Sequence, residues 1–165
     1  MEKRKSFLNQ KGFSLVELII VIAIMAILVA VMVPVLIKFI EKSNVSSDYQ
    51  LADTVRGAFL CAVTDARVIE DPKSDEFFTA LESTAGLEID TDSRFLSTGS
   101  VMYTSAQEII GVPLAQLPKQ IKSSHPQNGS HFIVRVVNGD VTVEITNTDA
   151  SGKKNPSVGD NIMVD

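Results

Sequence analysis

The chain has 165 residues, with 15 lysines and arginines against 20 aspartates and glutamates, which gives a net charge of −5. That length accommodates one domain and an appended segment. Because no basic stripe is present to neutralise phosphates, nucleic-acid binding is disfavoured. The one cysteine, Cys61, excludes an intramolecular disulfide and a cysteine-based metal site. We expect Cys61 to be a small buried apolar residue, with a reactive or intermolecular thiol as the alternative.

The N-terminal region combines a short basic segment with a long apolar one. Residues 1–12 carry more basic than acidic side chains: Lys3, Arg4, Lys5 and Lys11 against Glu2. From Leu18 to Ile37, twenty residues have neither a charge nor a hydrogen-bonding side chain. As a helix this run would span about 30 Å, the thickness of a bilayer's hydrocarbon core. Because a basic flank stays in the cytoplasm, we expect a single membrane crossing with the C-terminal body outside.

The apolar segment is predicted to continue into an amphipathic helix over residues 38–69. Apolar residues recur there at steps of three and four: Val45, Tyr49, Ala52, Val55, Phe59, Ala62 and Ala66. Charged residues fall mostly on the other side: Asp48, Asp53, Arg56, Asp65 and Arg67. We predict one helix of about 55 residues and about 80 Å, ending near Pro72 because the residue before a proline avoids the helical region. Residues 13–37 would lie in lipid or in a helical bundle, and residues 38–69 would pack under a globular head.

Residues 70–165 are predicted to form that head, so the fold class is α+β. One short helix is expected over Asp75–Ala85, with Ser74 as its cap and Gly86 as its stop. A second is expected over Ser105–Ile110, with Thr104 as its cap and Gly111 as its stop. Residues 114–117 would form a single turn. Residues 87–99 have no clear assignment.

The β signals come late in the chain. His131–Val137 and Val141–Thr146 are rich in valine and isoleucine, and Asn138-Gly139-Asp140 between them predicts a hairpin. Residues 141, 143 and 145 alternate with polar residues, which fits one buried and one wet face. Asn161–Val164 would be a last edge strand. A small antiparallel sheet of this kind would cover the amphipathic face of the long helix.

At the start of the apolar run stands the sequence Lys11-Gly12-Phe13-Ser14-Leu15-Val16-Glu17. It resembles the class III signal and the prepilin-type N-terminal methylation motif of type IV pilins and pseudopilins, and the match covers about the first 40 residues. The resemblance implies that residues 1–12 are a leader cut off after Gly12 by a prepilin peptidase. The new amine of Phe13 would then be N-methylated. It also implies a pilin-like fold and no catalytic activity.

Glu17 is a carboxylate beside a run that lies in lipid, where a charge is costly. A simple headgroup-level charge at the end of an anchor is one interpretation. The resemblance implies another: Glu17 of an incoming subunit meets the amine of Phe13 on a neighbour in the filament. Two such charges are tolerable in an apolar core only when paired, and the pairing would set axial register.

Pro34 lies late in the apolar run, where it removes one backbone donor and clashes with the preceding turn. The simple expectation is a kink in the helix at Pro34. The resemblance implies a further property, that the helix loosens near this proline when packed in a filament.

Several other chemistries are disfavoured. His125 and His131 are the only histidines and lack a second ligand at helical spacing, so a metal centre is not expected. The segment Asp149–Asn161 offers oxygen ligands, and some pseudopilins bind calcium in such a loop. Its spacing, with Lys153 and Lys154 in the middle, is not that of a known calcium loop. No catalytic triad or phosphate loop is present, so we expect neither an enzyme nor a cofactor.

Three functions are compatible with this sequence. The first is a structural subunit of a type IV pilus that serves adhesion, motility or related surface roles. It would start in the cytoplasmic membrane with its N-terminus inside and end in an extracellular homo-oligomeric filament. The resemblance implies a prepilin peptidase and methylase, a platform membrane protein and a cytoplasmic assembly ATPase as partners. The second is a pseudopilin of a type II secretion or DNA-uptake system, and the third a membrane-anchored binding or enzymatic ectodomain. The lone Cys61 cannot staple a C-terminal loop, which points to a Gram-positive source or to a pseudopilin.

Overall fold

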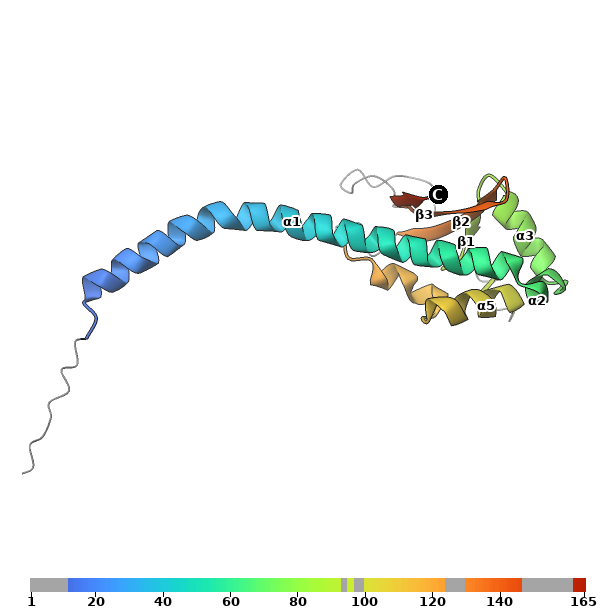
Figure 1. Ribbon diagram of the computed structural model, residues 1–165, viewed down its shortest axis with the longest axis horizontal. Helices are drawn as coiled ribbons and strands as arrows, with labels where there is room; N and C mark the ends of the chain where they lie inside the picture. The colour runs from blue at the N-terminus through green and yellow to red at the C-terminus, as the bar shows by residue number, and fades with distance from the viewer. Residues whose placement is uncertain (1–11, 93–94, 97–99, 124–129, 147–161) are drawn as a thin grey trace, which may run out of the picture. The chain divides into compact units, whose positions relative to one another are not determined.

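The computed structural model describes residues 12–92, 95–96, 100–123, 130–146 and 162–165. The chain divides into two compact units, of which the first ends at Ile40 and the second begins at Glu41. The long helix α1 (Leu15–Thr64) contributes to both units (Figure 1). The second unit contains a four-stranded antiparallel sheet, so the predicted α+β class with a long apolar N-terminal helix is confirmed.

Helix α1 ends at Thr64, about one turn earlier than predicted. Asp65 adopts an extended backbone (φ −71°, ψ 123°), and its carboxylate accepts a hydrogen bond from the backbone N–H of Arg67 at 2.9 Å. Asp65 therefore acts as the N-cap of a separate short helix, α2 (Ala66–Ile69). Hydrogen bonds from Arg67 hold the pKa of the Asp65 carboxyl below its usual value.

The part of α1 in the second unit buries one face, which is the predicted face at Ala52, Val55, Phe59 and Ala62 and differs from it at the two ends. Its fully buried residues recur at steps of three and four: Asp48, Ala52, Val55, Ala58, Phe59 and Ala62. Tyr49 and Ala66, which were predicted to lie on this face, are exposed. Asp48, which was predicted to face solvent, is buried. The prediction was wrong at this end of the face because Asp48, and not the adjacent Tyr49, is the first buried residue of α1.

The sheet order is β1-β2-β3-β4, and all neighbouring strands are antiparallel. The strands are β1 (Leu87–Glu88), β2 (His131–Val137), β3 (Asp140–Thr146) and β4 (Ile162–Val164). Asn138 (φ 54°) and Gly139 (φ 85°) form a two-residue turn in which both residues have positive φ. The hairpin prediction is confirmed, with Asp140 belonging to β3 rather than to the turn. Residues 141, 143 and 145 are buried as predicted.

Helix α3 differs from its prediction mainly at its C-terminal end, and helix α5 at its N-terminal end. Helix α3 (Ser74–Glu82) has Lys73 in the N-cap position, so Ser74 lies inside the helix, and the helix ends before the predicted Ala85. Helix α5 (Val101–Ile110) begins four residues earlier than predicted. Its N-cap is Ser100, whose Oγ accepts from the N–H of Met102 at 3.2 Å, and Thr104 instead donates to the carbonyl of Ser100. Gly111 (φ 78°) ends this helix as predicted.

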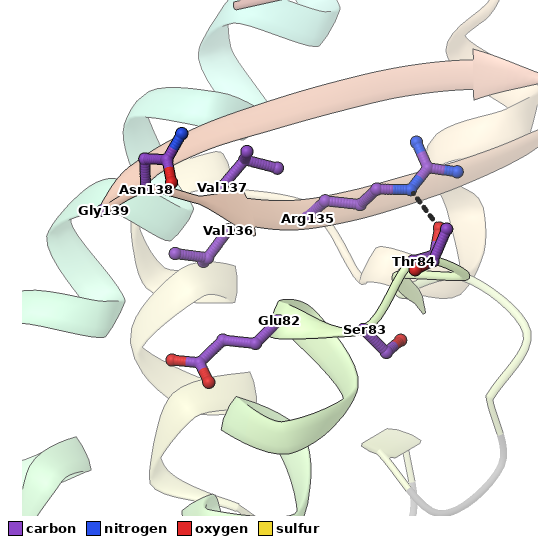
Figure 2. Close-up of a pocket in the computed structure, with 8 residues that line it drawn as sticks. All are labelled: Glu82, Ser83, Thr84, Arg135, Val136, Val137, Asn138 and Gly139. Carbon is purple, nitrogen blue, oxygen red and sulfur yellow. Dashed lines mark hydrogen bonds between the residues drawn. The ribbon is translucent and has the colours of Figure 1, made fainter.

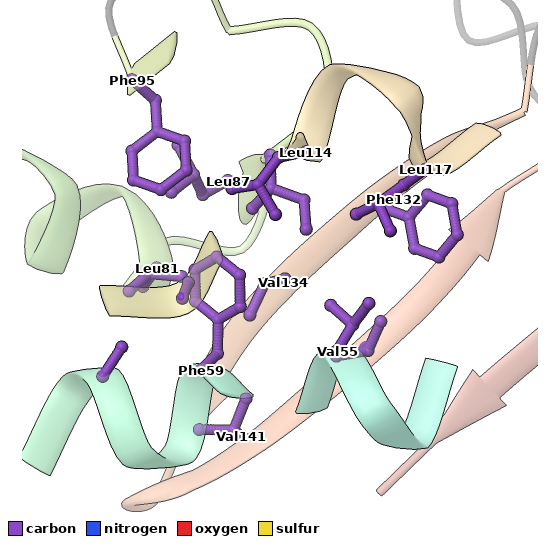
Figure 3. Packing of buried hydrophobic residues seen from close by; sticks show 14 of the residues in the cluster. Val55, Phe59, Leu81, Leu87, Phe95, Leu114, Leu117, Phe132, Val134 and Val141 are labelled. Atoms are coloured by element: carbon purple, nitrogen blue, oxygen red, sulfur yellow. The ribbon is translucent and has the colours of Figure 1, made fainter. Parts of the chain in front are cut away.

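A single hydrophobic core fills the space between α1, the sheet and the shorter helices (Figure 3). Residues 114–120 form a 3₁₀ helix, η1 (Leu114–Gln120), longer than the predicted turn. The ring of Phe95 lies 5.0 Å from that of Phe77 and 5.6 Å from that of Tyr103, both edge to face. Phe59 on α1 and Phe132 on β2 are also fully buried. These contacts hold the sheet and the helical segments on the buried face of α1.

Candidate functional site

The first part of α1 presents an apolar surface that no other described residue covers. Every residue from Gly12 to Ile40 is exposed. By length and composition α1 is the one helix among the described residues that is able to cross a membrane. Exposed apolar patches on monomeric soluble proteins rarely exceed a few hundred Å². This surface therefore requires lipid or other protein chains around it.

The predicted cleavage point lies just outside the helix. Gly12 and Phe13 precede the first helical residue, Leu15, and have no regular secondary structure. The Phe13 side chain is 93% exposed, and a Cβ built on Gly12 would meet no atom within 4 Å. Neither Gly12 nor the Phe13 side chain is therefore covered by another residue that the structure describes.

Glu17 caps the N-terminal end of its own helix. The backbone N–H of Ser14 donates to Glu17 Oε2 at 2.8 Å, while the carbonyl of Ser14 accepts from the N–H of Leu18 at 3.2 Å. Ser14 is therefore the N-cap residue, and the Glu17 carboxylate lies where the helix dipole favours a negative charge. Only Oε2 takes part in this hydrogen bond, so the geometry leaves Oε1 available for a second donor.

The contact between Ser14 and Glu17 was missed in the sequence reasoning. Serine followed three residues later by glutamate, just before an apolar run, is the spacing of a helix capping box. That signal was present in the motif but was interpreted only through Gly12, Phe13 and Glu17. Pro34 lies within the continuous helix α1, and the kink expected there stays a prediction.

The described residues of the head form no candidate metal centre. No cluster of three or more potential ligands occurs among those residues. His131 instead contacts the buried Asp90, with Nδ1 3.1 Å from Oδ2. His125 and the candidate calcium segment 149–161 lie outside the described residues. Cys61 is exposed, so the expectation that it would be buried is wrong.

A hollow of about 600 Å³, lined by both polar and apolar residues, lies between the end of α3 and the β2–β3 hairpin (Figure 2). Arg135 borders it, but its guanidinium is engaged by the carbonyl of Thr84 at 3.1 Å and by the carboxylate of Glu144 at 2.7 Å. Its lining includes neither a nucleophile with an adjacent base nor a set of metal ligands.

Comparisons with known proteins bear on the N-terminal region. Residues 8–33, which include Gly12, Phe13 and Glu17, match the family model described as the prokaryotic N-terminal methylation motif. The Type IV narrow pilus major component PilA5 of Thermus thermophilus is 38% identical over 81 residues, which are 48% of this chain and 68% of the relative. The chain belongs to the type IV pilin family.

A second relative of this pilin is the Fimbrial protein of Moraxella nonliquefaciens, 39% identical over 64 residues. That alignment covers 39% of the chain and 42% of the relative, so the two proteins share less than half of their lengths. No solved structure matches the pilin at the same level of significance. Neither relative supports the Gram-positive source that the lone cysteine suggested.

Proposed function

We propose that this pilin is cut after Gly12, methylated on the new amine of Phe13 and polymerised through α1 into a surface filament. The observation that carries the proposal is the exposed, largely apolar segment from residue 13 to residue 40, most of which lies within the methylation motif of residues 8–33. Both named relatives are pilus or fimbrial proteins. Before assembly lipid would cover this surface, and in the filament the α1 helices of other copies would cover it.

Glu17 has a defined task in this scheme. Cleavage creates an ammonium at Phe13, and a filament core as apolar as lipid tolerates that charge only when it is paired. The Glu17 carboxylate already uses Oε2 to bind its own backbone. Its other oxygen can accept the Phe13 amine of a neighbouring copy, so one side chain would both cap its helix and join two subunits.

The proposal also defines compartments and partners. The basic leader would keep the N-terminus of the precursor in the cytoplasm, and the head would lie outside the cytoplasmic membrane. A prepilin peptidase and methylase would process the chain there. A platform membrane protein and a cytoplasmic ATPase would drive assembly, because this chain carries no energy-converting motif of its own.

Electron microscopy of filaments sheared from cells tests the proposal. We expect Glu17→Ala to enter the membrane fraction and to be processed, but to yield few filaments. Glu70→Ala is the matched control, because Glu70 is an exposed glutamate outside the apolar segment. A filament yield equal to wild type from Glu17→Ala would remove the assembly role of this residue.

A pseudopilin is the second candidate, favoured by the absence of a cysteine pair that could staple the head. It would be processed in the same way and would share the same α1 contacts. The two functions differ in the length of the fibre at native expression levels. Long surface filaments support the pilin, and short fibres confined to the cell envelope support the pseudopilin.

A further inference from the structure

Part of the edge of β2 is unpaired and borders the hollow between α3 and the β2–β3 hairpin (Figure 2). Towards the hairpin, β1 pairs with β2 only as far as Val134. The residue before β1, Gly86 (φ 77°), does not continue the ladder, because its N–H donates to the carbonyl of Ser83 at 3.1 Å. Val136, two residues beyond Val134, therefore has no partner strand on this side and lines the hollow.

The backbone of Val136 directs its hydrogen-bonding groups to this side of β2. Val136 and Val141 lie opposite each other in β2 and β3. The Val141 carbonyl accepts from Arg56 Nε at 2.8 Å, and the Val141 N–H donates to the Asp140 side chain at 2.9 Å. In such a non-hydrogen-bonded pair, the backbone groups of both residues point away from the partner strand. The N–H and C=O of Val136 thus point away from β3, and they form no hydrogen bond with any residue that the structure describes.

The two edges of the sheet differ at this end. On β3, Arg56 binds the outward carbonyl of Val141 and also pairs with Asp140 at 2.9 Å. On β2, no described side chain binds the N–H or C=O of Val136. Proteins usually cover, shorten or charge an exposed strand edge, because it pairs readily with another extended chain. An open edge beside a hollow of about 600 Å³ is suited to accept such a chain.

The charges around the hollow indicate which side chain an added strand would carry. Glu82 is exposed and forms no ion pair with a described residue, whereas Arg135 is neutralised by Glu144 at 2.7 Å. In Figure 2 the side chains of Glu82 and Val136 lie on the same side of β2, and that of Val137 lies on the other. Residues directly opposite in neighbouring strands place their side chains on the same face of a sheet. The residue opposite Val136 would therefore direct its side chain towards Glu82, where a lysine or arginine fits.

We propose that this edge binds an extended, basic segment of another protein as an added antiparallel strand. The bound residue opposite Val136 exchanges two backbone hydrogen bonds with it, and its lysine or arginine side chain pairs with Glu82. The next residues of the bound strand contact Val137, which is 50% exposed. Residues 41–165 carry 18 acidic and 10 basic side chains, which adds to the attraction for a basic segment. The inference does not depend on polymerisation, because all of these residues belong to the second unit.

Amide NMR of the full chain in maltoside micelles, titrated with a short peptide, tests the proposal. The probe is the acetylated and amidated pentapeptide Thr-Val-Lys-Val-Thr, whose β-branched residues favour an extended backbone. We expect saturable shifts at Val136, Val137 and Ser83. The same peptide with a methyl group on the backbone nitrogen of its lysine cannot donate to the Val136 carbonyl. It should cause no saturable shift at these amides.

One substitution in the protein tests the role of charge. Glu82→Gln should weaken binding of the lysine peptide about threefold, as expected for the loss of an exposed ion pair. Glu70→Gln, at an exposed glutamate outside the hollow, should bind like wild type. Equal affinity of Glu82→Gln and wild type would overturn the proposal, and so would equal binding of the N-methylated peptide. Shifts of the same amides with protein concentration alone would assign this edge to a second copy of the chain and would also overturn it.

Discussion

Asp48 accepts a hydrogen bond from the backbone N–H of Ser123 at 2.9 Å, across 75 residues of sequence. A second bond, from the N–H of Lys122, reaches the other carboxylate oxygen at 2.8 Å. The side chain is fully buried, so these two amides satisfy a charge that would otherwise be costly. These two hydrogen bonds thus hold the segment after η1 against α1, in a chain that has no disulfide.

The first prediction concerns the two hydrogen bonds that Asp48 accepts. Asp48→Ala leaves two backbone N–H groups without their acceptor, and hydrogen bonds to charged groups contribute about 1.5–3 kcal/mol each. We expect the free energy of unfolding to fall by about 3 kcal/mol, measured by urea unfolding of the full chain in maltoside micelles. Asp53→Ala, an exposed acidic residue on the same helix, should change it by less than about 0.5 kcal/mol. Equal effects of the two substitutions would contradict the account.

The second prediction concerns Gly86, where the chain turns into β1. Its φ is +77°, and an added Cβ would lie 2.6 Å from Arg135 Cγ and from Ile133 Cγ2, and 2.9 Å from the carbonyl oxygen of Val134. Gly86→Ala therefore combines left-handed backbone strain with crowding against β2. We expect a loss of about 2–4 kcal/mol in the same unfolding measurement.

Gly111→Ala provides the matched control for Gly86→Ala. Gly111 has nearly the same φ, +78°, but an added Cβ would meet nothing within 4 Å. Its substitution should cost only the backbone strain, about 1 kcal/mol. If both substitutions cost the same, close approach to β2 has no part in the role of Gly86.

The third prediction concerns pH. Burial raises the pKa of the Asp90 carboxyl, although hydrogen bonds from the Phe132 N–H and from His131 partly offset the effect. A raised pKa in the folded state means that the native protein holds this proton more tightly than the unfolded chain. The stability due to Asp90 is then fully present below the unfolded pKa of about 3.9. It falls as the pH rises through the native pKa.

Asp90→Asn removes this titration and keeps an oxygen for the Phe132 N–H. Its free energy of unfolding should therefore decline less than that of wild type as the pH rises from about 4 towards neutrality. Urea unfolding at a series of pH values measures the difference. Asp75→Asn, at an exposed residue of α3, should follow the wild-type profile. Parallel profiles for wild type and Asp90→Asn would show that burial of this carboxyl does not affect stability.

Local patterns predicted the elements with strong signals. The Asn138-Gly139 turn and the alternation along β3 were correct because both depend on neighbouring residues alone. Asp48 was assigned to the wrong face because its partners lie 74 and 75 residues away, in a segment without a periodic pattern. Only the structure shows that the backbone N–H groups of Lys122 and Ser123 donate to this carboxylate. Cys61 was predicted to be buried because its neighbours in the sequence are apolar. In the structure it lies just outside the buried face of α1 and is exposed.

The candidate site was predicted in part. A motif of fixed spacing identified Gly12, Phe13 and Glu17, since its chemistry is local to one stretch of chain. The contact between Ser14 and Glu17 also had a local signal, the capping-box spacing, but that signal was not interpreted.

The mass of the N-terminal peptide from sheared filaments tests the central claim most directly. Proteolysis followed by mass spectrometry of the main filament band should yield a first peptide that begins with N-methylated Phe13. That result would establish cleavage after Gly12 and polymerisation of the cleaved chain together. Filaments whose subunits still begin at Met1 would contradict the account.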